Sequence, residues 1–227
     1  MAYVLGLWVL RGGIRVNYTR KILHFTLFFT PLVLYEWLPF PGGLHTAFLS
    51  GVVYLGTLAL VSEPMRRRFP GLAVVFAAMD RPEDRPHTLR WLWTQGLATY
   101  VVLLAMLTAL SHYGKVPLIY ITVLVAAIGD GLAEPVGVRF GRHTYTTRAL
   151  FTDRRYTRGL EGSACVLASG FLAVYLLRAQ LEPQQLVAAF ILIPLAMTLA
   201  EAWSPHTWDG PFLYLAGGLA TIAVLHV

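Results

Sequence analysis

The sequence predicts an all-α polytopic membrane protein with about seven transmembrane helices, a cytoplasmic N-terminus and a C-terminus on the outer side. Composition is the first observation behind this fold class. Only 13% of the 227 residues are charged and 56% are hydrophobic, whereas a soluble domain carries about 25% charged residues. The second observation is a series of long apolar stretches, and the third is the placement of basic residues in alternate loops.

Seven apolar stretches are long enough to cross a bilayer, for which a helix needs about 17–25 residues. They cover residues 22–40, 44–62, 89–111, 116–134, 162–178, 186–201 and 211–227. An eighth stretch, residues 71–79, is too short and is expected to lie at the interface or to re-enter the membrane. Strands are not expected, because no segment alternates in the manner of a membrane barrel. The whole chain, residues 1–227, is therefore expected to form one integral-membrane domain.

The basic residues determine the expected sidedness. Sixteen of the eighteen Lys and Arg residues precede the first span or lie between spans two and three or four and five, and only Lys115 and Arg178 fall on the other side. The positive-inside rule then places the N-terminus and both long loops in the cytoplasm. We expect a multi-pass protein of a prokaryotic plasma membrane, in contact with membrane lipid and with no nucleic-acid partner.

Four polar segments are brought to the cytoplasmic membrane surface by this topology. They are TRKILHF (19–25), IGDGLAEPVG (128–137), TRGLEGSA (157–164) and LAEAWSPHTWDGP (199–211). Segments that are far apart in sequence but end at one depth can together form a site. We therefore expect the functional site there, on the cytoplasmic side.

The acids of these segments predict a metal site. Asp130 and Glu134 are spaced i, i+4, so they share one face if the helix continues. Mg²⁺ prefers one or two carboxylates together with water and phosphate oxygens. Glu201, His206 and Asp209 follow later in the chain, and one of them is expected to complete the site. The alternative is that the acids only pair with loop arginines.

Glycines and bases surround those acids. Glycine allows backbone to approach a ligand and exposes N–H groups to anions, and arginine binds phosphate. A polyphosphate site is thus predicted, with helix packing as the alternative role for the glycines. The residues concerned are Gly129, Gly131, Gly137, Arg139, Gly141 and Arg142.

Two further groups are candidates for catalysis. Arg20, Lys21 and His24 share one helix face, where the bases can bind phosphate and His24 can orient or deprotonate an alcohol. Glu161 begins span five, where it either accepts a proton or meets the helix dipole. The alternatives for the first group are a topology anchor and a packing histidine.

The order of these motifs resembles the CTP-dependent lipid kinases, which include phytol, farnesol and dolichol kinases and CTP-using diacylglycerol kinases. The resemblance runs from about residue 20 to the C-terminus, and the block at 129–163 is its most specific part. Its elements here are Arg20-Lys21-Ile22-Leu23-His24, Gly129-Asp130-Gly131-Leu132-Ala133 through Gly137, Phe140-Gly141-Arg142, Arg158-Gly159-Leu160-Glu161-Gly162-Ser163, and Glu201 through Asp209-Gly210. Three positions differ from the family pattern: Arg158 replaces a lysine, Gly159 a serine and Gly210 an asparagine.

The resemblance implies phosphoryl transfer from CTP or UTP, with Mg²⁺, to the hydroxyl of a membrane isoprenoid alcohol such as phytol, geranylgeraniol or a dolichol. The implied catalytic residues are Asp130, His24, Glu161 and Lys21, and the implied metal ligands are Asp130, Glu134, Glu201 and Asp209. The implied nucleotide-binding residues are Arg20, Lys21, Gly129, Gly131, Gly137, Arg139, Gly141, Arg142, Arg158, Gly162 and Ser163.

Three alternatives stay open at the level of sequence. One is a CTP-dependent diacylglycerol kinase. Another is a phosphatidate cytidylyltransferase-like CDP-lipid synthase, whose similar glycine–aspartate pattern is followed by a terminal signature that His206-Thr207-Trp208-Asp209 matches poorly. The third is a small transporter or lipid-binding protein, which would distribute polar groups through the depth of the bilayer.

Overall fold

The computed structural model describes residues 1–37, 44–150 and 152–227 of the chain. It is mostly helical, as expected from the sequence. The α-helices are α1 (Ala2–Leu10), α2 (Val16–Trp37), α3 (Leu44–Leu60), α4 (Glu63–Arg68), α5 (Pro70–Ala77), α6 (Thr88–His112), α7 (Ile119–Leu124), α8 (Gly131–Phe140), α9 (Leu160–Leu176), α10 (Pro183–Trp203) and α11 (Asp209–Val224). Short helical segments are η1 (Pro82–Asp84), η2 (Val116–Leu118), η3 (Val125–Asp130) and η4 (Arg178–Gln180).

Among the residues that the structure describes, three stretches of helix are long and apolar enough to cross a membrane. They are Thr88–His112, Val116–Phe140 and Pro183–Trp203, whereas α3, α9 and α11 are apolar but only 16–17 residues long. Helix α2 begins at Val16, so the predicted first span at 22–40 starts too late, and its last three residues lie outside the described part. The short stretch at 71–79 forms α5, an eight-residue helix that packs on α1.

The predicted span at 116–134 continues to Phe140 and contains a change of helix type. Residues Val125–Asp130 form a π-helical turn between α7 and α8. Turns of this kind are rare, and they occur frequently at functional sites. The helix therefore does not end at Asp130 and Glu134, and both acids lie on it as the i, i+4 spacing requires.

A small β-hairpin corrects the expectation that the chain has no strands. Strand β1 (Thr144–Arg148) pairs with β2 (Arg155–Gly159) in antiparallel register, with Tyr145 opposite Arg158. Both strands carry Thr and Tyr, which favour extended backbone. They lie in the connection between α8 and α9, outside the apolar helices. The hairpin leads directly into α9, so it positions Arg158 at the start of that helix.

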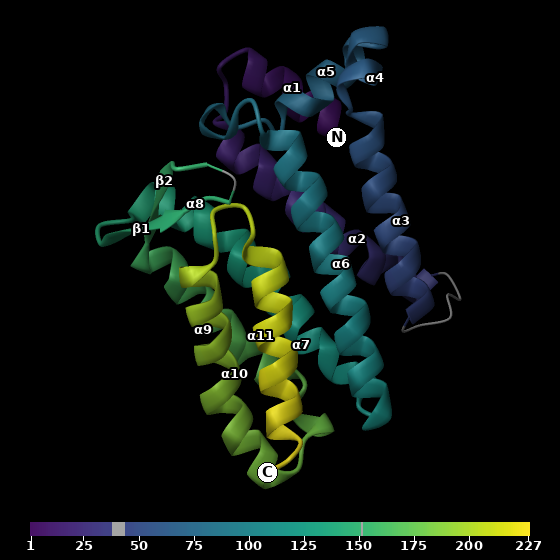
Figure 1. Ribbon diagram of the computed structural model, residues 1–227, viewed down its shortest axis with the longest axis vertical. Helices are drawn as coiled ribbons and strands as arrows, with labels where there is room; N and C mark the ends of the chain where they lie inside the picture. The colour runs from purple at the N-terminus through teal and green to yellow at the C-terminus, as the bar shows by residue number, and fades with distance from the viewer. Residues whose placement is uncertain (38–43, 151) are drawn as a thin grey trace.

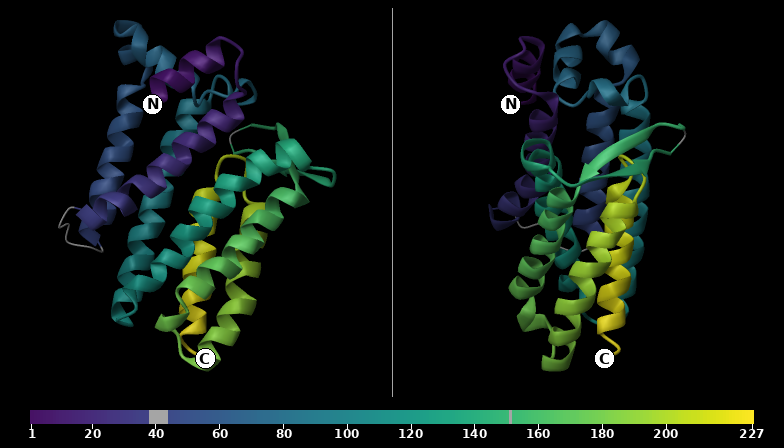
Figure 2. Two further views of the ribbon diagram at one scale, coloured as in Figure 1. Left: turned by 180° about the vertical axis from the view of Figure 1, so that it is seen from behind. Right: turned by 90° about the vertical axis from the view of Figure 1, so that its left-hand side faces the viewer.

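The helices form two groups that meet along the long axis of the molecule (Figure 1). Helices α9, α10 and α11 pack with α7, η3 and α6 around a buried core that includes Leu110, Ile121, Val166, Ile193 and Leu213. Small residues permit the close approach, as expected for helix packing in lipid. Helices α2 and α3 stand on the other side, and α1 and α5 cover their end opposite the C-terminus (Figure 2).

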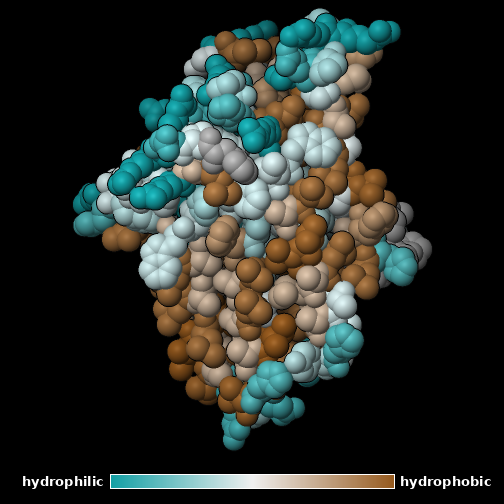
Figure 3. All heavy atoms as spheres, in the orientation of Figure 1, coloured by the Kyte–Doolittle hydropathy of each residue, from teal (hydrophilic) through white to brown (hydrophobic). Residues whose placement is uncertain are grey.

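The surface is divided into polar ends and an apolar middle. Hydrophilic residues gather over α4 and the hairpin, at the end where α1 and α5 also expose apolar side chains, and hydrophobic residues cover most of α9, α10 and α11 in the view of Figure 3. On α10, Val187 is 63% exposed and Ile191 is 56% exposed. Large apolar side chains exposed over a continuous surface are typical of contact with lipid or with another apolar surface.

Candidate functional site

A single cavity of about 810 Å³ receives side chains from all four segments that the sequence singled out. It lies between α2, α8 and the hairpin, with the segment 79–83 and the α10–α11 connection forming further walls. The predicted site residues that line it are Arg20, Lys21, His24, Asp130, Glu134, Gly137, Arg158, Gly162, Ser163, Glu201 and Asp209. The expected convergence of remote segments is thus present in the fold.

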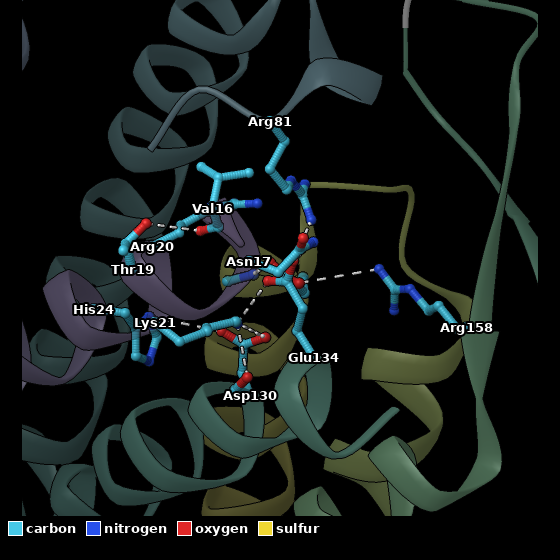
Figure 4. Close-up of polar contacts among 12 residues, drawn as sticks. Val16, Asn17, Thr19, Arg20, Lys21, His24, Arg81, Asp130, Glu134 and Arg158 are labelled. Atoms are coloured by element: carbon cyan, nitrogen blue, oxygen red, sulfur yellow. Dashed lines mark hydrogen bonds and ion pairs between the residues drawn. The ribbon is translucent and has the colours of Figure 1, made fainter. Parts of the chain in front are cut away.

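Lys21 and Asp130 form the centre of the cavity's polar half (Figure 4). Lys21 Nζ donates to the backbone carbonyl oxygen of Asp130 at 2.7 Å and to its Oδ1 at 3.1 Å. The same Nζ lies 3.8 Å from Glu134 Oε2. Lys21 is only 7% exposed, so its charge is balanced by these carboxylates rather than by bulk water.

His24 lies against the π-helical turn. Its Nε2 is 3.1 Å and 3.2 Å from the carbonyl oxygens of Ala126 and Ala127. A carbonyl oxygen only accepts hydrogen bonds, so Nε2 must carry the proton. In the neutral ring Nδ1 is then an acceptor, and it lies 3.8 Å from Asp130 Oδ2 beside the cavity. In its neutral form, His24 therefore has its unprotonated nitrogen next to the acid pair.

Arg81, which the sequence reading placed only among the loop bases, holds Glu134 and the 80–87 segment together. Its NH1 donates to Glu134 Oε1 at 2.9 Å, and its Nε donates to Asp84 Oδ2 at 2.7 Å. Asn17 donates to the same Glu134 oxygen at 2.8 Å. Arg81 is 6% exposed and Asp84 is 2% exposed. In the sequence, the nearness of Arg81 to Glu83 and Asp84 is the only sign of this network, and such a group of charges does not by itself indicate burial.

His206 extends this network. Its Nε2 lies 2.9 Å from Asp84 Oδ1, and its ring stacks on Tyr156 with 3.6 Å between centroids. Burial would raise the pKa of Asp84, but the hydrogen bond with His206 and the charge of Arg81 hold it below its ordinary value. Burial lowers the pKa of His206, against the opposing hydrogen bond with Asp84. His206 thus contacts Asp84 and does not join Asp130 as a ligand.

A second charged cluster lies across the cavity, around Arg158. Arg158 NH1 donates to the carbonyl oxygen of Glu201 and, at 2.9 Å, to its Oε1, and NH2 is 4.0 Å from Asp209 Oδ2. Ser163 Oγ donates to Glu201 Oε2 at 3.0 Å. Figure 4 shows Arg158 approaching from the hairpin, on the side opposite Lys21. Strand β2 and helix α9 thereby bring a base and a hydroxyl to the end of α10.

Glu161 lies outside the cavity lining and anchors the turn before the hairpin. Its Oε1 accepts hydrogen bonds from the backbone N–H groups of Arg142 and His143 and from His143 Nδ1, at 3.0–3.2 Å. These contacts give Glu161 a structural role in holding the turn at Arg142 and His143. Its predicted catalytic role stays a prediction.

The predicted glycines divide into packing and open positions. A Cβ on Gly129 would lie 2.3 Å from Ser169 Oγ, one on Gly131 would lie 2.7 Å from the Phe25 ring, and one on Gly162 would lie 2.7 Å from a backbone oxygen. Gly137 faces open space among the described residues. Close helix contact therefore accounts for three of them, and Gly137 is the one beside which a ligand has room.

Three predicted nucleotide-binding residues near the end of α8 lie outside the described cavity lining. Arg139 and Arg142 are exposed, and the guanidinium of Arg139 lies 5.6 Å from the Phe140 ring centroid. Gly141 packs against the carbonyl oxygen of Gly137 at the end of α8. None of the three lines the cavity, so the structure gives them no position from which to contact a ligand bound there.

The four predicted metal ligands form two pairs. Asp130 and Glu134 lie on one helix with Lys21, whereas Glu201 and Asp209 lie beside Arg158. Within the described residues, no group of three or more His, Cys, Asp or Glu side chains has the arrangement of a metal site. The Asp130–Glu134 pair fits Mg²⁺ bound by one or two carboxylates with phosphate and water oxygens. The short hydrogen bonds from Lys21 and Arg81 go to Asp130 Oδ1 and Glu134 Oε1. Asp130 Oδ2 and Glu134 Oε2 are therefore the oxygens that a cation would use.

The charge of the cavity lining is nearly balanced. Arg20, Lys21, Arg81 and Arg158 face five acids, which are Glu83, Asp130, Glu134, Glu201 and Asp209. With neutral histidines, the lining carries a formal charge of minus one. A polyphosphate without a cation would be repelled by such a lining, whereas a metal–polyphosphate complex would bring compensating charge.

Comparisons of the chain with protein-family models, with curated proteins and with solved structures find no match. Any proposal about function therefore rests on the residues that line the cavity.

Proposed function

We propose that the protein is a CTP-dependent kinase that phosphorylates the hydroxyl of a membrane isoprenoid alcohol at the cytoplasmic membrane face. The observation that carries the proposal is the shared cavity, in which Lys21, His24 and Asp130 meet Arg158 from a remote part of the chain. Bases for phosphate, acids for a cation and a neutral imidazole for a hydroxyl proton are the parts that phosphoryl transfer requires.

Binding of the triphosphate would use both sides of the cavity. Lys21 and Arg20 face it from α2, and Arg158 faces it from the hairpin. Mg²⁺, when bound by Asp130 and Glu134, would offset the negative charge of the phosphates and of the acidic lining. Lys21 is already held between these carboxylates, so it can turn toward a phosphate oxygen with little movement of backbone.

The reaction begins with the acceptor hydroxyl beside His24. Nδ1 accepts the hydroxyl proton, and the alcohol oxygen forms a bond to the γ-phosphorus while the bond from that phosphorus to the bridging β-phosphate oxygen breaks. CDP leaves with this oxygen, and the Lys21 and Arg158 cations stabilise the charge that develops. Asp130, 3.8 Å from Nδ1, stabilises the imidazolium until its proton returns to water.

Membrane topology is part of the proposal. Seven crossings would be formed by α2, α3, α6, the Val116–Phe140 helix, α9, α10 and α11, in a prokaryotic plasma membrane. The termini lie at opposite ends of the long axis (Figure 1), which supports an odd number of crossings. The cavity lies nearer the end covered by basic α4, and this supports a cytoplasmic site.

The experiment is a transfer assay with the full chain purified in detergent. The protein is incubated with Mg²⁺, one γ-labelled nucleotide at a time, and phytol, geranylgeraniol, undecaprenol or diacylglycerol. We expect label in the organic phase with CTP and an isoprenoid alcohol, with equimolar CDP. Release of pyrophosphate with formation of a CDP-lipid from phosphatidate would contradict the proposal, and so would the absence of transfer to every alcohol.

A further inference from the structure

The cavity has an apolar half beside its polar half. Leu23 and Leu27 of α2 line it on one side, Leu58 and Val61 lie at the end of α3 on the other, and α5 contributes Leu72 and Val75. The polar half begins beside Leu23, at Lys21 two residues before it and His24 directly after it. An apolar chamber is thus continuous with the charged site.

The packing of the surrounding helices leaves this half open toward the side of the molecule. Along their described residues, α2 packs mainly on α8 and α3 packs mainly on α6. Tyr54 fixes α3 to α6, because its hydroxyl donates to the Leu92 carbonyl oxygen at 3.2 Å and its ring lies on Gly96. Figure 2 shows α2 and α3 lying apart below α1 and α5 and approaching each other farther from that cover. The cavity lies between them.

The top of the chamber is closed by a tight helix pair. Gly6 of α1 faces the backbone of Val74 in α5, too close for any side chain. Thr19 Oγ1 donates to the Ala78 carbonyl oxygen at 2.8 Å and so ties the end of α5 to α2. A ligand would therefore reach the apolar half from between α2 and α3, and not through the α1–α5 cover.

The chemistry of the two halves defines the occupant. Leu27 is 38% exposed and Leu60 is 52% exposed, so the opening itself is apolar. Nucleotides and soluble alcohols have no part that gains from such a surface, whereas each buried CH₂ of a lipid contributes about 0.8 kcal/mol. An amphiphile with a hydroxyl at the end of a long apolar chain matches both halves at once.

We infer that the hydrocarbon chain of a membrane alcohol lies in the apolar half between α2 and α3, beneath α5, with its hydroxyl at His24 and Asp130. The inference rests on the proposed function for the role of the hydroxyl, and on the cavity alone for the place of the chain. The alcohol enters sideways from the bilayer, so its chain never leaves an apolar environment.

Photo-labelling of the full-length protein in detergent tests the place of the chain without turnover. The probe is geranylgeraniol that carries a diazirine in its tail, and labelled peptides are mapped by mass spectrometry. We expect label in residues 20–27 and 57–61, and competition by unmodified geranylgeraniol. Label distributed mainly over the lipid-facing surface of α9, α10 and α11 would overturn the inference.

Matched tryptophan variants test the same site by blocking it. Thr57→Trp and Leu27→Trp place a large ring in the chamber, whereas Val53→Trp and Val33→Trp place it on exposed positions of the same helices outside the lining. We expect the first pair to reduce labelling about tenfold and the controls to leave it unchanged, since the loss of two CH₂ contacts corresponds to about that factor. Equal labelling of all four variants would contradict the inference.

Turnover separates this inference from the proposed function. With CTP, Thr57→Trp is expected to reduce kcat/KM for geranylgeraniol about tenfold and to leave the rate with a five-carbon prenol unchanged. Label in the chamber without phosphorylation of any alcohol overturns the kinase and retains the chain site. Phosphorylation with label elsewhere overturns the chain site and retains the kinase. Should both chamber variants fail to fold, the labelled peptides of the unmodified protein decide.

Discussion

Lys21 and Asp130, 109 residues apart in the chain, make two hydrogen bonds at the centre of the cavity. One of them uses the Asp130 backbone carbonyl oxygen, at 2.7 Å, which lies at the junction between the π-helical turn and α8. The irregular turn therefore gives Lys21 an acceptor that does not depend on the Asp130 side chain. Removal of the carboxylate charge should leave this contact in place.

Asp130→Asn is expected to abolish turnover, by about 10³-fold or more, while the protein remains folded. Asparagine keeps Oδ1 as an acceptor for Lys21 but loses the charge that would bind Mg²⁺. The measurement is kcat of the transfer reaction together with the melting temperature in detergent. Were Asp130 only a partner of Lys21, the double variant Lys21→Met with Asp130→Asn would recover activity, and such recovery would remove the metal assignment.

His24→Gln tests the proposed base. The glutamine amide can still donate to the Ala126 carbonyl oxygen, but it has no basic nitrogen at the position of Nδ1. We expect kcat to fall about 10²–10⁴-fold, with the KM for CTP unchanged and the acidic limb of the pH–rate profile flattened. A variant with unaltered kcat would show that His24 only packs against the π-helical turn.

Gly129→Ala should act through folding and not through nucleotide binding. The added Cβ meets Ser169 Oγ at 2.3 Å and the backbone of Val166 at 2.9 Å, and overpacking of this kind costs about 1–3 kcal/mol. Thermal unfolding should show the loss, and Ser169→Gly should relieve part of it. A normal melting temperature with a raised KM for CTP would instead favour a backbone contact with nucleotide.

Gly137→Ala is the matched substitution at an open position. Its Cβ enters free space among the described residues, and alanine favours the helix by up to about 1 kcal/mol. We expect unchanged or higher thermal stability, and a raised KM for CTP because Gly137 lines the cavity. An unchanged KM would exclude Gly137 from the nucleotide site.

Arg81→Ala is expected to destabilise the protein by about 3–5 kcal/mol, because Asp84 and Glu134 would remain buried without their guanidinium. Arg85→Ala is the control. Arg85 pairs with Asp80 on the surface, with a side chain that is 57% exposed, and should cost at most about 1 kcal/mol. Denaturant or thermal unfolding in detergent gives both values. Equal losses would show that the Arg81 network contributes no more than a surface ion pair.

The stability of the protein should fall as pH decreases below 6.5, the ordinary pKa of histidine. Burial lowers the pKa of His206 in the folded state, so the unfolded chain binds a proton first and is favoured by acid. Arg81, Arg20 and Asp84 are the charged groups that act on His206, and Asp84 opposes the shift.

The measurement is the melting temperature between pH 7.5 and pH 5.5 for the unmodified protein and for His206→Gln. The variant should lose less stability on acidification. His226→Gln, at an exposed position near the other end of the molecule, serves as the control and should follow the unmodified protein. An identical acid response in all three proteins would contradict the direction given for His206.

The helical class and the convergence of four polar segments on one cavity could be predicted from the chain alone. Hydropathy depends only on local composition, so the apolar helices are visible without any tertiary information, and the positions of Lys21, His24 and Asp130 relative to those helices follow from simple counting. The β-hairpin was missed because its two strands are short, polar and paired only with each other.

The partners of the site residues could not be read in this way. Arg81 reaches Glu134 from a connecting segment, where no periodic pattern indicates which side chain is buried. Gly129 and Gly137 belong to the same glycine-rich stretch, yet one faces α9 and the other faces open space, and this difference depends on the neighbouring helix. The free nitrogen of His24 depends on two carbonyl oxygens of the π-helical turn. Hydropathy is a property of a segment, whereas a charge, a proton or a missing Cβ acts through the atoms within a few ångströms of it, and those atoms come from elsewhere in the chain.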